Sequence, residues 1–344
     1  MKMKKKTLVI GIISLIYTVL GSSYIFFPDG RLNEVLSVKS GLAHFYAFSA
    51  LTAFLMLVFS IVMLFISRFR NRFKLKFDGA DVILIFTVVL SLFFIFFGAE
   101  HKKIEAEDSA QSSIKLCEWN AADNINEKNI QAVFGEFDAD IAVFPELGGY
   151  KKGDKPEQRL ADLFKKAELD FAEYRVYVSE ETEGNIAPVT VVLKKTLGPY
   201  DIYEERPATR FGTLYLSSRA TDSPPLIGLH TAPPLPGLMR IWQRDLDLIT
   251  ELAGKHQDAI IIGDFNATMK HGRLHSIRTH TDVLDYAPRF HSGTWNTNIP
   301  SVFRTRIDHI LIPNNKYSVT SAEIKKFPNS DHLCVFAELQ SLGD

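Results

Sequence analysis

Eight polar residues that could bind a metal ion or move a proton stand at the ends of short apolar runs. Strand ends let a rigid sheet present side chains to a substrate without burying them. The set comprises Asn120, Glu146, His230, Asp264, Asn266, Asp308, Asp331 and His332. Oxygen ligands of this kind suit Mg²⁺, Mn²⁺ or Ca²⁺, and the absence of a Cys/His cluster argues against structural zinc. A single carboxylate at a strand end is usually a turn former, so the hypothesis of a site rests on the whole set.

The apolar runs that carry these residues predict the strands of an α/β domain. Strand-like segments lie at 114–122, 140–147, 174–179, 189–193, 214–218, 226–230, 259–266, 306–312 and 333–339. Helical spacing is confined to 126–137, 159–167 and 238–253. Many strands with few helices between them predict two packed sheets covered by helices, in place of a purely βαβ fold.

Six short motifs carry a family resemblance. In chain order they are Trp119–Asn120, Pro145–Glu146, LHTAPP from Leu229, GDFNAT from Gly263, RIDHIL from Arg306 and SDH at Ser330–His332. In this order and spacing, the series resembles the endonuclease/exonuclease/phosphatase superfamily, which has the DNase I-like fold. The resemblance implies a four-layer α/β/β/α sandwich with the site at one edge of the paired sheets.

The resemblance also implies roles for the candidate residues. Glu146 is similar to the principal metal-binding carboxylate of the family, and Asn120 and Asp331 would help to hold the metal or its waters. The cofactor would then be Mg²⁺ or Mn²⁺. Asp264 matches the residue that orients or deprotonates the attacking water, and Asn266 would contact the phosphoryl group beside it.

Two histidines complete the implied machinery. His332 would stabilise the pentacovalent phosphorus as a donor or as an acid for the leaving oxygen, and Asp308 would hold its tautomer. His230 matches a second phosphate-binding histidine. Phosphoryl transfer needs in-line water, a cation on the phosphoryl oxygens and donors aimed at developing charge. A carboxylate beside a histidine fixes the imidazole and favours its protonated form.

Departures from the family pattern bear on the substrate. Many nuclease members carry Gln before the metal-binding Glu and a basic residue shortly after it, whereas this chain reads FPELGGY around Glu146. The stretch around Trp295 resembles the bacterial membrane-bound branch of the family. Arg304 and Arg306 in that stretch are interpreted either as phosphate contacts or as surface-exposed arginines. His271 and His275 could share a helix face in a second metal site, although a solvated or substrate-facing loop is favoured.

Three apolar segments at the start of the chain predict membrane spans. They lie at about 7–27, 41–67 and 82–99, are long enough to cross a hydrocarbon core, and contain no Asp, Glu, Lys or Arg. We therefore predict a three-helix membrane anchor over 1–99, a polar tether over 100–113 and a catalytic domain over 114–344.

Basic residues flanking the spans predict the orientation. Lys2 and Lys4–Lys6 precede the first span and five basic residues lie within 68–76, whereas the 28–40 loop carries only Arg31 and Lys39. The positive-inside rule places the N-terminus and the 68–80 loop in the cytoplasm, and the catalytic domain outside a bacterial-type inner membrane. A cleaved signal peptide is an alternative for the first span, and it leaves the same sidedness.

Charge argues against a long polyanion as substrate. Residues 1–100 hold 11 of the 39 basic and 5 of the 40 acidic residues, so the remainder holds 28 and 35 and is acidic. Proteins that grip nucleic acid without sequence preference need a basic footprint. Two cysteines, Cys117 and Cys334, cannot make a disulfide framework, and are read as buried thiols or as one bridge.

The leading hypothesis is a membrane-anchored metal-dependent phosphoesterase that hydrolyses a phosphate ester or pyrophosphate at the outer face of the membrane. A lipid-linked phosphate is attractive because the tether keeps the site near the lipid bilayer. One alternative is a tethered extracytoplasmic nuclease acting on DNA or RNA, which the acidic domain does not favour. Another is a binding module that kept the fold and lost the chemistry, which the complete set of eight residues argues against.

Overall fold

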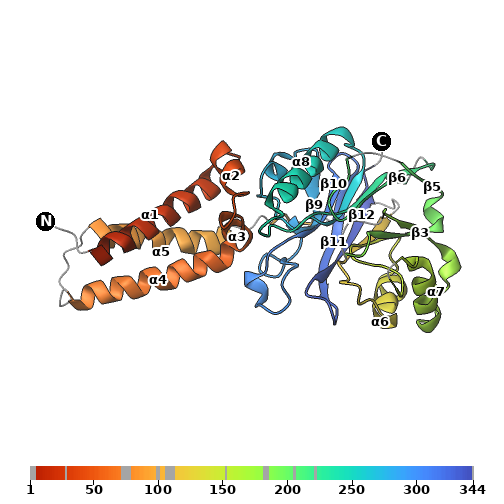
Figure 1. The fold of residues 1–344 in the computed structure, drawn as a ribbon, viewed down its shortest axis with the longest axis horizontal. Coiled ribbons are helices and arrows are strands. Elements are labelled where there is room, and N and C mark those ends of the chain that lie inside the picture. The colour runs from red at the N-terminus through yellow and green to blue at the C-terminus, as the bar shows by residue number, and fades with distance from the viewer. Residues whose placement is uncertain are drawn as a thin grey trace. The chain divides into compact units, whose positions relative to one another are not determined.

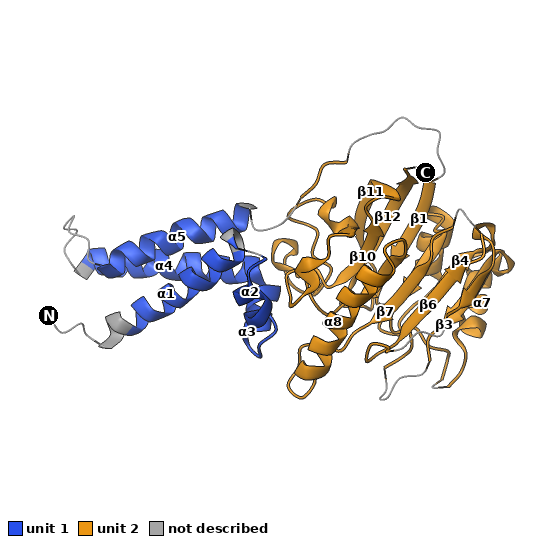
Figure 2. Ribbon diagram, turned by 90° about the horizontal axis from the view of Figure 1, so that it is seen from above, with its two compact units in different colours: residues 1–100 blue, residues 101–344 orange. Residues whose placement is uncertain are grey.

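The computed structural model describes residues 5–27, 29–70, 79–97, 101–104, 113–151, 153–180, 186–203, 207–220 and 223–342. The chain divides into two compact units, Met1–Glu100 and His101–Asp344 (Figure 2). Most of the predicted tether, the centre of the predicted cytoplasmic loop and the end of the third predicted span lie outside the described residues.

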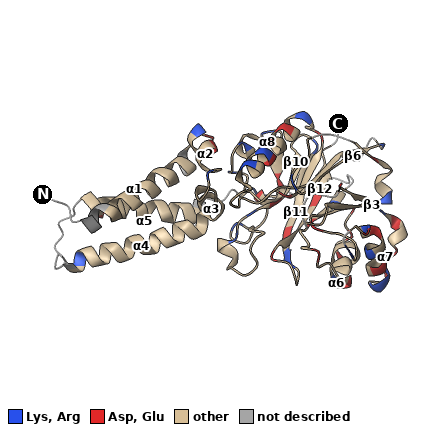
Figure 3. Cartoon of the chain, in the orientation of Figure 1, with Lys and Arg blue, Asp and Glu red and all other residues tan. Residues whose placement is uncertain are grey.

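The first unit is helical. It consists of α1 (Lys5–Phe26), α2 (Arg31–Leu36), α3 (Leu42–Ala47), α4 (Ser49–Arg70) and α5 (Gly79–Phe97). Helix α5 packs against both α1 and α4 (Figure 1). Two helical stretches, Ser49–Phe69 and Gly79–Phe96, are long and apolar enough to cross a membrane, and α1 has a shorter apolar stretch at Val9–Tyr24. Charged residues stand near the helix ends of this unit and are spread over the second unit (Figure 3).

The second predicted span, 41–67, was wrong as one continuous helix. The helical hydrogen bonding stops at Phe48, which separates α3 from α4, and α4 then runs on to Arg70. A tertiary contact joins the short helix α3 to the segment that follows α1, because the Tyr46 hydroxyl donates to Asn33 Oδ1 at 3.0 Å. Asn33 in turn donates to the carbonyls of Ser23 and Phe27 at the end of α1.

Two six-stranded sheets form the second unit. Sheet A has the order β11-β12-β1-β2-β4-β3 and sheet B the order β5-β6-β7-β8-β10-β9. The strands of sheet A are β1 (Ser113–Glu118), β2 (Ile141–Phe144), β3 (Tyr174–Val178), β4 (Thr190–Lys194), β11 (Tyr317–Lys326) and β12 (Leu333–Ser341). Those of sheet B are β5 (Tyr200–Ile202), β6 (Thr213–Ser218), β7 (Leu226–His230), β8 (Ile260–Asp264), β9 (His280–Asp282) and β10 (Asp308–Pro313).

Helices cover the outer face of each sheet. Helix α6 (Glu127–Ile130), the π-helical turn η1 (Gln131–Glu136) and α7 (Pro156–Lys166) pack on sheet A, and α8 (Met239–Lys255) lies over sheet B (Figures 1 and 2). The short 3₁₀ turns are η2 (Phe171–Glu173), η3 (Lys195–Leu197), η4 (Leu274–Ser276), η5 (Val283–Asp285) and η6 (Ser301–Phe303). The expected order of layers, helix–sheet–sheet–helix, is therefore observed.

Apolar side chains fill the space between these layers. One core lies between the sheets and takes Leu116 and Val143 from sheet A and Ile262 and Ile310 from sheet B. A second core joins the outer face of sheet A to α6, η1 and α7. On the other side, α8 buries a face that includes Trp242. Burial on this scale, at about 25 cal/mol per Å² of apolar surface, makes the paired sheets a rigid support.

The two sheets share one pattern at their centres. In sheet A, β1 pairs in parallel with β2 and antiparallel with β12. In sheet B, β8 pairs in parallel with β7 and antiparallel with β10. The carboxyl ends of each parallel pair therefore meet the amino end of the antiparallel strand at one edge of the sheet. That edge is where the predicted site residues fall.

Candidate functional site

The structure brings the eight candidate residues together from both sheets. Sheet A supplies Asn120 after β1, Glu146 after β2, and Asp331 and His332 immediately before β12. Sheet B supplies His230 at the end of β7, Asp264 and Asn266 at the end of β8, and Asp308 at the start of β10. His230, Asp264 and Asp308 are aligned in register across three neighbouring strands.

Asp264 is the centre of the cluster. Its Oδ2 accepts from the Asn120 amide at 3.0 Å, and its Oδ1 accepts from the Asn266 backbone N–H at 2.7 Å. The Nε2 atoms of His230 and His332 lie 3.5 Å and 3.9 Å from Oδ2. Burial, and after it the charge of Asp308, raises the pKa of Asp264 to about 7. A carboxylate that exchanges its proton near neutral pH suits a general base.

One glycine allows this arrangement. A Cβ on Gly263 would lie 1.9 Å from the Leu229 carbonyl oxygen, and Gly263 has a φ of +149°. Only glycine therefore lets β8 pass β7 closely enough to bring Asp264 beside His230. The first residue of the GDFN motif is thus explained by backbone packing, and its Asp by chemistry.

His332 and Asp308 form a hydrogen-bonded pair across the two sheets. His332 Nδ1 lies 2.8 Å from Asp308 Oδ1 and 3.0 Å from Oδ2. Burial alone would lower the pKa of His332, but the charge and hydrogen bond of Asp308 outweigh it and raise that pKa to about 10. The imidazole is therefore protonated at neutral pH, with Nε2 directed toward Asp264 and able to donate to an anion.

His230 behaves differently from His332. It is 2% exposed, and burial followed by the charge of His332 lowers its pKa to about 3. Its Nε2 lies 3.5 Å from Asp264 and 3.8 Å from Glu146, so the neutral tautomer with its proton on Nε2 would face both carboxylates. In that tautomer Nε2 could also donate to a phosphoryl oxygen.

Glu146 is aimed by its backbone. It has a φ of +57°, which is strained for a residue with a side chain and is common at functional sites. Asn120 donates to its Oε1 at 3.1 Å, and the side chain is 27% exposed. The following loop is tied down by Arg159, which bonds the Asp123 carboxylate and the Gly148 carbonyl.

The loop after Glu146 is crowded at Gly149. A Cβ on Gly149 would lie 2.5 Å from the backbone oxygen of Asp154, so a residue with a side chain does not fit there without a shift of the loop. The glycine at this position of FPELGGY therefore has a reason in backbone packing.

The donor set fits a hard divalent cation. Glu146 and Asp331 are partly exposed carboxylates on either side of Asn120 and His332, and carboxylate oxygens are the ligands that Mg²⁺ prefers. As placed, Asn120 turns its amide nitrogen to Glu146 and Asp264, while its oxygen accepts from the Ala122 N–H at 3.0 Å. In this rotamer Asn120 orients the carboxylates, and a ligand role for its oxygen stays a prediction.

A second trio is also compact enough for a metal ion. Asp264, Asp308 and His332 each bring one ligand atom within 4.8 Å of the others. A histidine binds a metal in its neutral form. Asp308 favours the protonated form of His332 in this arrangement, so a metal ion bound by the trio would have to displace that proton.

Asn266 is held in a strained turn. Its φ is +46°, and its side-chain amide donates one hydrogen to the Thr231 carbonyl at 3.1 Å. The amide has a second hydrogen that this contact does not use. Trp242 of α8 donates to the Asn266 carbonyl at 3.1 Å and supports the turn from behind.

Other polar residues noted in the sequence have structural partners. His271 Nδ1 accepts from the Thr268 N–H at 2.9 Å, and His275 lies in the one-turn helix η4, so the two do not share a helix face. Arg304 donates to the Ile299 carbonyl at 3.1 Å. Arg306 donates to Ser292 and to Asp285. Both arginines hold the 285–306 segment together. Arg306 is 17% exposed, so its interpretation as a surface-exposed arginine was wrong, and a phosphate contact by either arginine stays a prediction.

One residue of the site region was missed in the sequence. Glu118 on β1 is fully buried, and both of its carboxylate oxygens lack a hydrogen-bond partner. Burial, and then the charges of Asp308 and Asp264, raise its pKa well above the usual range. A charged residue inside the apolar run IKLCEWN was the signal that could have identified it.

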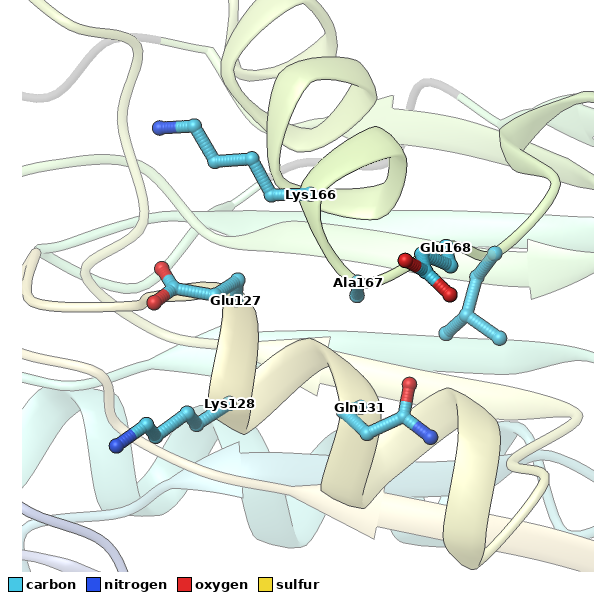
Figure 4. Close-up of a pocket in the computed structure, with 7 residues that line it drawn as sticks. Glu127, Lys128, Gln131, Lys166, Ala167 and Glu168 are labelled. Atoms are coloured by element: carbon cyan, nitrogen blue, oxygen red, sulfur yellow. The ribbon is translucent and has the colours of Figure 1, made fainter.

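A surface hollow of about 450 Å³ lies apart from the eight residues. It is lined by Glu127, Lys128 and Gln131 around α6 and by Lys166–Leu169 at the end of α7 (Figure 4). Its lining mixes opposite charges on the outer helix layer and includes no histidine or strand-end carboxylate. The chemistry of the chain is therefore assigned to the edge of the sheets.

A family profile and several solved structures are similar to this chain. Residues 117–332 match the profile described as the Endonuclease/Exonuclease/phosphatase family. Among solved structures, truncated TDP2 from Caenorhabditis elegans is similar at 14% identity with a TM-score of 0.46, over 66% of this chain and 98% of that one. The endonuclease domain of the telomere-specific retrotransposon TRAS1 is similar at 14% and 0.46, over 67% and 99%.

A family protein from Leptotrichia buccalis is similar at 15% identity with a TM-score of 0.46, over 65% of this chain and 98% of that one. Among curated proteins, none matches this sequence.

Proposed function

Because the chain belongs to the endonuclease/exonuclease/phosphatase family, we propose that it is a metal-dependent hydrolase of phosphoester bonds with its active centre at Asp264. The observation that carries this proposal is a carboxylate that can accept a proton beside an imidazolium that can donate one. Asp264 has a pKa raised to about 7, and His332, whose Nε2 lies 3.9 Å away, has a pKa raised to about 10. A base and an acid side by side are what hydrolysis by water requires.

The proposed reaction begins with the water that attacks phosphorus. Asp264 Oδ2 accepts a proton from this water, while Asn120 and the Asn266 N–H hold the carboxylate in place. His332 then donates from Nε2 to a phosphoryl oxygen or to the leaving oxygen. Asp308 accepts from Nδ1 and keeps the ring oriented and protonated, so that Nε2 carries the proton that it donates.

His230 and Glu146 complete the proposed site. The neutral His230 donates from Nε2 to a second phosphoryl oxygen and adds no charge that would hold the product. Glu146, with Asp331 and Asn120, would hold Mg²⁺ or Mn²⁺, which supplies positive charge to the phosphoryl oxygens when bound. Removing these donors one at a time separates binding from proton transfer.

We further propose that the first unit anchors the enzyme in a bacterial inner membrane, with the catalytic unit outside. Side chains on α4 and α5, among them Phe65, Phe69, Val82 and Val89, are each more than half exposed. Water does not tolerate a continuous apolar surface of this kind, whereas lipid tails cover it. The basic residues that flank the spans support the outward orientation.

A phosphate ester or pyrophosphate carried by a lipid is the substrate class that we favour. An anchored site works beside the bilayer surface, and the acidic second unit disfavours a long polyanion.

A substrate comparison tests this proposal. The full-length protein in detergent would be assayed with Mg²⁺ against a polyprenyl pyrophosphate in mixed micelles, plasmid DNA, RNA and a soluble phosphodiester. Asp264→Ala is the inactive variant, and Glu136→Gln, at an exposed carboxylate remote from the site, is the matched control. Phosphate release from the lipid that Asp264→Ala abolishes and Glu136→Gln keeps is the expected result. Cleavage confined to DNA or RNA would replace the lipid substrate with a nucleic acid.

A further inference from the structure

All three tryptophans of the chain support predicted site residues with their indole N–H groups. Trp119 donates to the His332 carbonyl at 3.3 Å and Trp242 donates to the Asn266 carbonyl at 3.1 Å. Trp295 differs, because its partner is a side chain: Nε1 donates to Asp331 Oδ2 at 2.7 Å. A backbone carbonyl cannot swing away from its donor, whereas a carboxylate can.

The segment that carries Trp295 is bonded to both sheets. Toward sheet A, the Leu333 N–H donates to the Thr294 carbonyl at 2.8 Å, and the Thr297 N–H donates to the Asp331 carbonyl at 2.9 Å. Toward sheet B, the Thr294 hydroxyl oxygen accepts from the N–H groups of Ile307 and Asp308 at 3.1 Å and 3.2 Å. Residues 294–297 therefore form a clamp between the strand ends that carry Asp308 and His332.

The clamp makes Trp295 a fixed donor. The backbone of Trp295 exchanges hydrogen bonds with Thr305, at 3.0 Å and 2.7 Å. It also forms a bridge with His332 in sheet A. The indole thus has little freedom of its own, and a 2.7 Å hydrogen bond to an ionised group is of the short, charge-assisted kind.

Asp331 needs such a donor. Its side chain is 45% exposed, so without a partner it would sample several rotamers in water. With Oδ2 held by the indole, Oδ1 is left 4.0 Å from His332 Nε2, at the place where the phosphate and the cation meet in the proposed function. A carboxylate that is held by a donor offers its free oxygen in one direction only.

We propose that Trp295 is a positioning residue that sets the direction of the Asp331 carboxylate toward the divalent cation or its waters. This inference rests on the proposed function, and it adds a residue from outside the strand-end set. It also gives a physical role to the Trp of Trp295–Asn296, the WN dipeptide that precedes the RIDHIL motif. Partners of metal-binding groups typically contribute about 10- to 100-fold to metal affinity or activity.

A double-mutant cycle on metal binding tests the proposal without relying on turnover. Mn²⁺ binding to the full-length protein in detergent would be followed by the loss of the free-ion EPR signal, for wild type, Trp295→Phe, Asp331→Ala and the double variant. We expect Trp295→Phe to weaken Mn²⁺ binding about tenfold in the wild-type background and to have almost no effect when Asp331 is absent. Trp242→Phe, which removes an indole bond to a backbone carbonyl, is the matched control and leaves Mn²⁺ affinity unchanged.

Two results would overturn the proposal. An equal loss of Mn²⁺ affinity with and without Asp331 would mean that Trp295 acts through general packing. No loss at all would mean that the indole hydrogen bond does not contribute to Mn²⁺ binding. Glu146→Gln separates this failure from that of the proposed function. If Glu146→Gln weakens Mn²⁺ binding and Trp295→Phe does not, only the positioning role fails, whereas indifference to both removes the proposed metal site.

A spectroscopic measurement covers the case in which Trp295→Phe does not fold. The full-length protein would be labelled with 5-fluorotryptophan, which gives three ¹⁹F resonances for three tryptophans. Addition of Mg²⁺ should shift the Trp295 resonance most, and Asp331→Asn should move the same resonance without metal. A Mg²⁺ response confined to the buried Trp119 or Trp242 would contradict the assignment.

Discussion

The two sheets contribute unequal halves of one site. The carboxylates of sheet A, Glu146 and Asp331, are 27% and 45% exposed, whereas Asp264 and Asp308 of sheet B are 1% and 0% exposed. Burial is the largest cause of the raised pKa of Asp264. We call the buried sheet B side of the site the dry half and the exposed sheet A side the wet half. The dry half can therefore tune proton transfer, and the wet half can exchange ligands with solvent.

His332 connects the two halves. It belongs to sheet A, yet its pKa is set by Asp308 of sheet B. Asn120 makes the reverse connection, because it stands on sheet A and bonds Asp264 at 3.0 Å. Similar strand arrangements thus give different chemistry, because one edge is covered and the other is open to water.

The largest expected effect is in the dry half. Asp264→Asn keeps the shape of the side chain and removes the base, so we expect kcat to fall about 10³- to 10⁴-fold with little change in Mg²⁺ affinity. Steady-state kinetics over a Mg²⁺ titration measures both quantities. A variant that keeps most of its kcat would show that Asp264 is not the base, and a variant that only loses Mg²⁺ affinity would assign Asp264 to the metal.

The next effect tests the connection through Asp308. In the wild type, activity should be lost as pH falls through about 7, where Asp264 gains a proton, and again as pH rises through about 10, where His332 loses one. Asp308 raises both pKa values, so Asp308→Asn should move both limbs of the profile to lower pH. We expect kcat at neutral pH to fall about 10²-fold.

The matched control for this variant is a second buried histidine–aspartate pair. His309 Nδ1 lies 2.7 Å from Asp282 Oδ2, and the pair is as buried as His332–Asp308. Asp282→Asn should leave the positions of both limbs in place. Movement of the limbs in this control, or fixed limbs in Asp308→Asn, would remove Asp308 as the origin of the tuning.

The wet half should respond to metal concentration. Glu146→Gln is expected to weaken Mg²⁺ binding about 10- to 100-fold, and saturating Mg²⁺ should restore part of the activity. Isothermal titration with Mg²⁺ checks the affinity, with Glu136→Gln as the exposed-carboxylate control. Unchanged affinity in Glu146→Gln would transfer the cation to the dry trio of Asp264, Asp308 and His332, and would reverse the comparison between the sheets.

Much of this site could be predicted from the sequence because it lies at strand ends. Apolar runs ending in Asn, Asp or His locate β1, β7 and β8 and the polar residues at their ends. The order of the motifs, through the family resemblance, predicted that these polar residues meet at one edge of the sheets. The register between neighbouring strands cannot be read from a single apolar run, and it is this register that aligns His230 with Asp264 and Asp308. Positive φ at Glu146 and Asn266 also depends on loops held by distant residues.

Other elements gave no readable local signal. Strand β11 is ten residues long, but a bulge between Val319 and Ser321 breaks its alternation, and its exposed edge is polar. The break at Phe48 lies in an apolar stretch, and the hydrogen bond from Tyr46 to Asn33 nearby joins residues that are distant in sequence. Trp295 stood out only through resemblance, because its partner Asp331 is distant in sequence.

The smallest expected effect concerns the one acidic side chain of sheet A that is fully buried beside the dry half. Glu118 has a pKa raised well above its usual range, chiefly by burial, which favours its neutral form. Glu118→Gln has the shape and charge of that neutral form, and we expect kcat within about threefold of wild type and a stability change of about 1 kcal/mol or less. Asp264→Asn makes the same chemical exchange nearby and should be far more damaging. Thermal unfolding and kcat measured on the two variants together decide the point, and a large loss of kcat in folded Glu118→Gln would place an ionised carboxylate of sheet A inside the proton-transfer machinery.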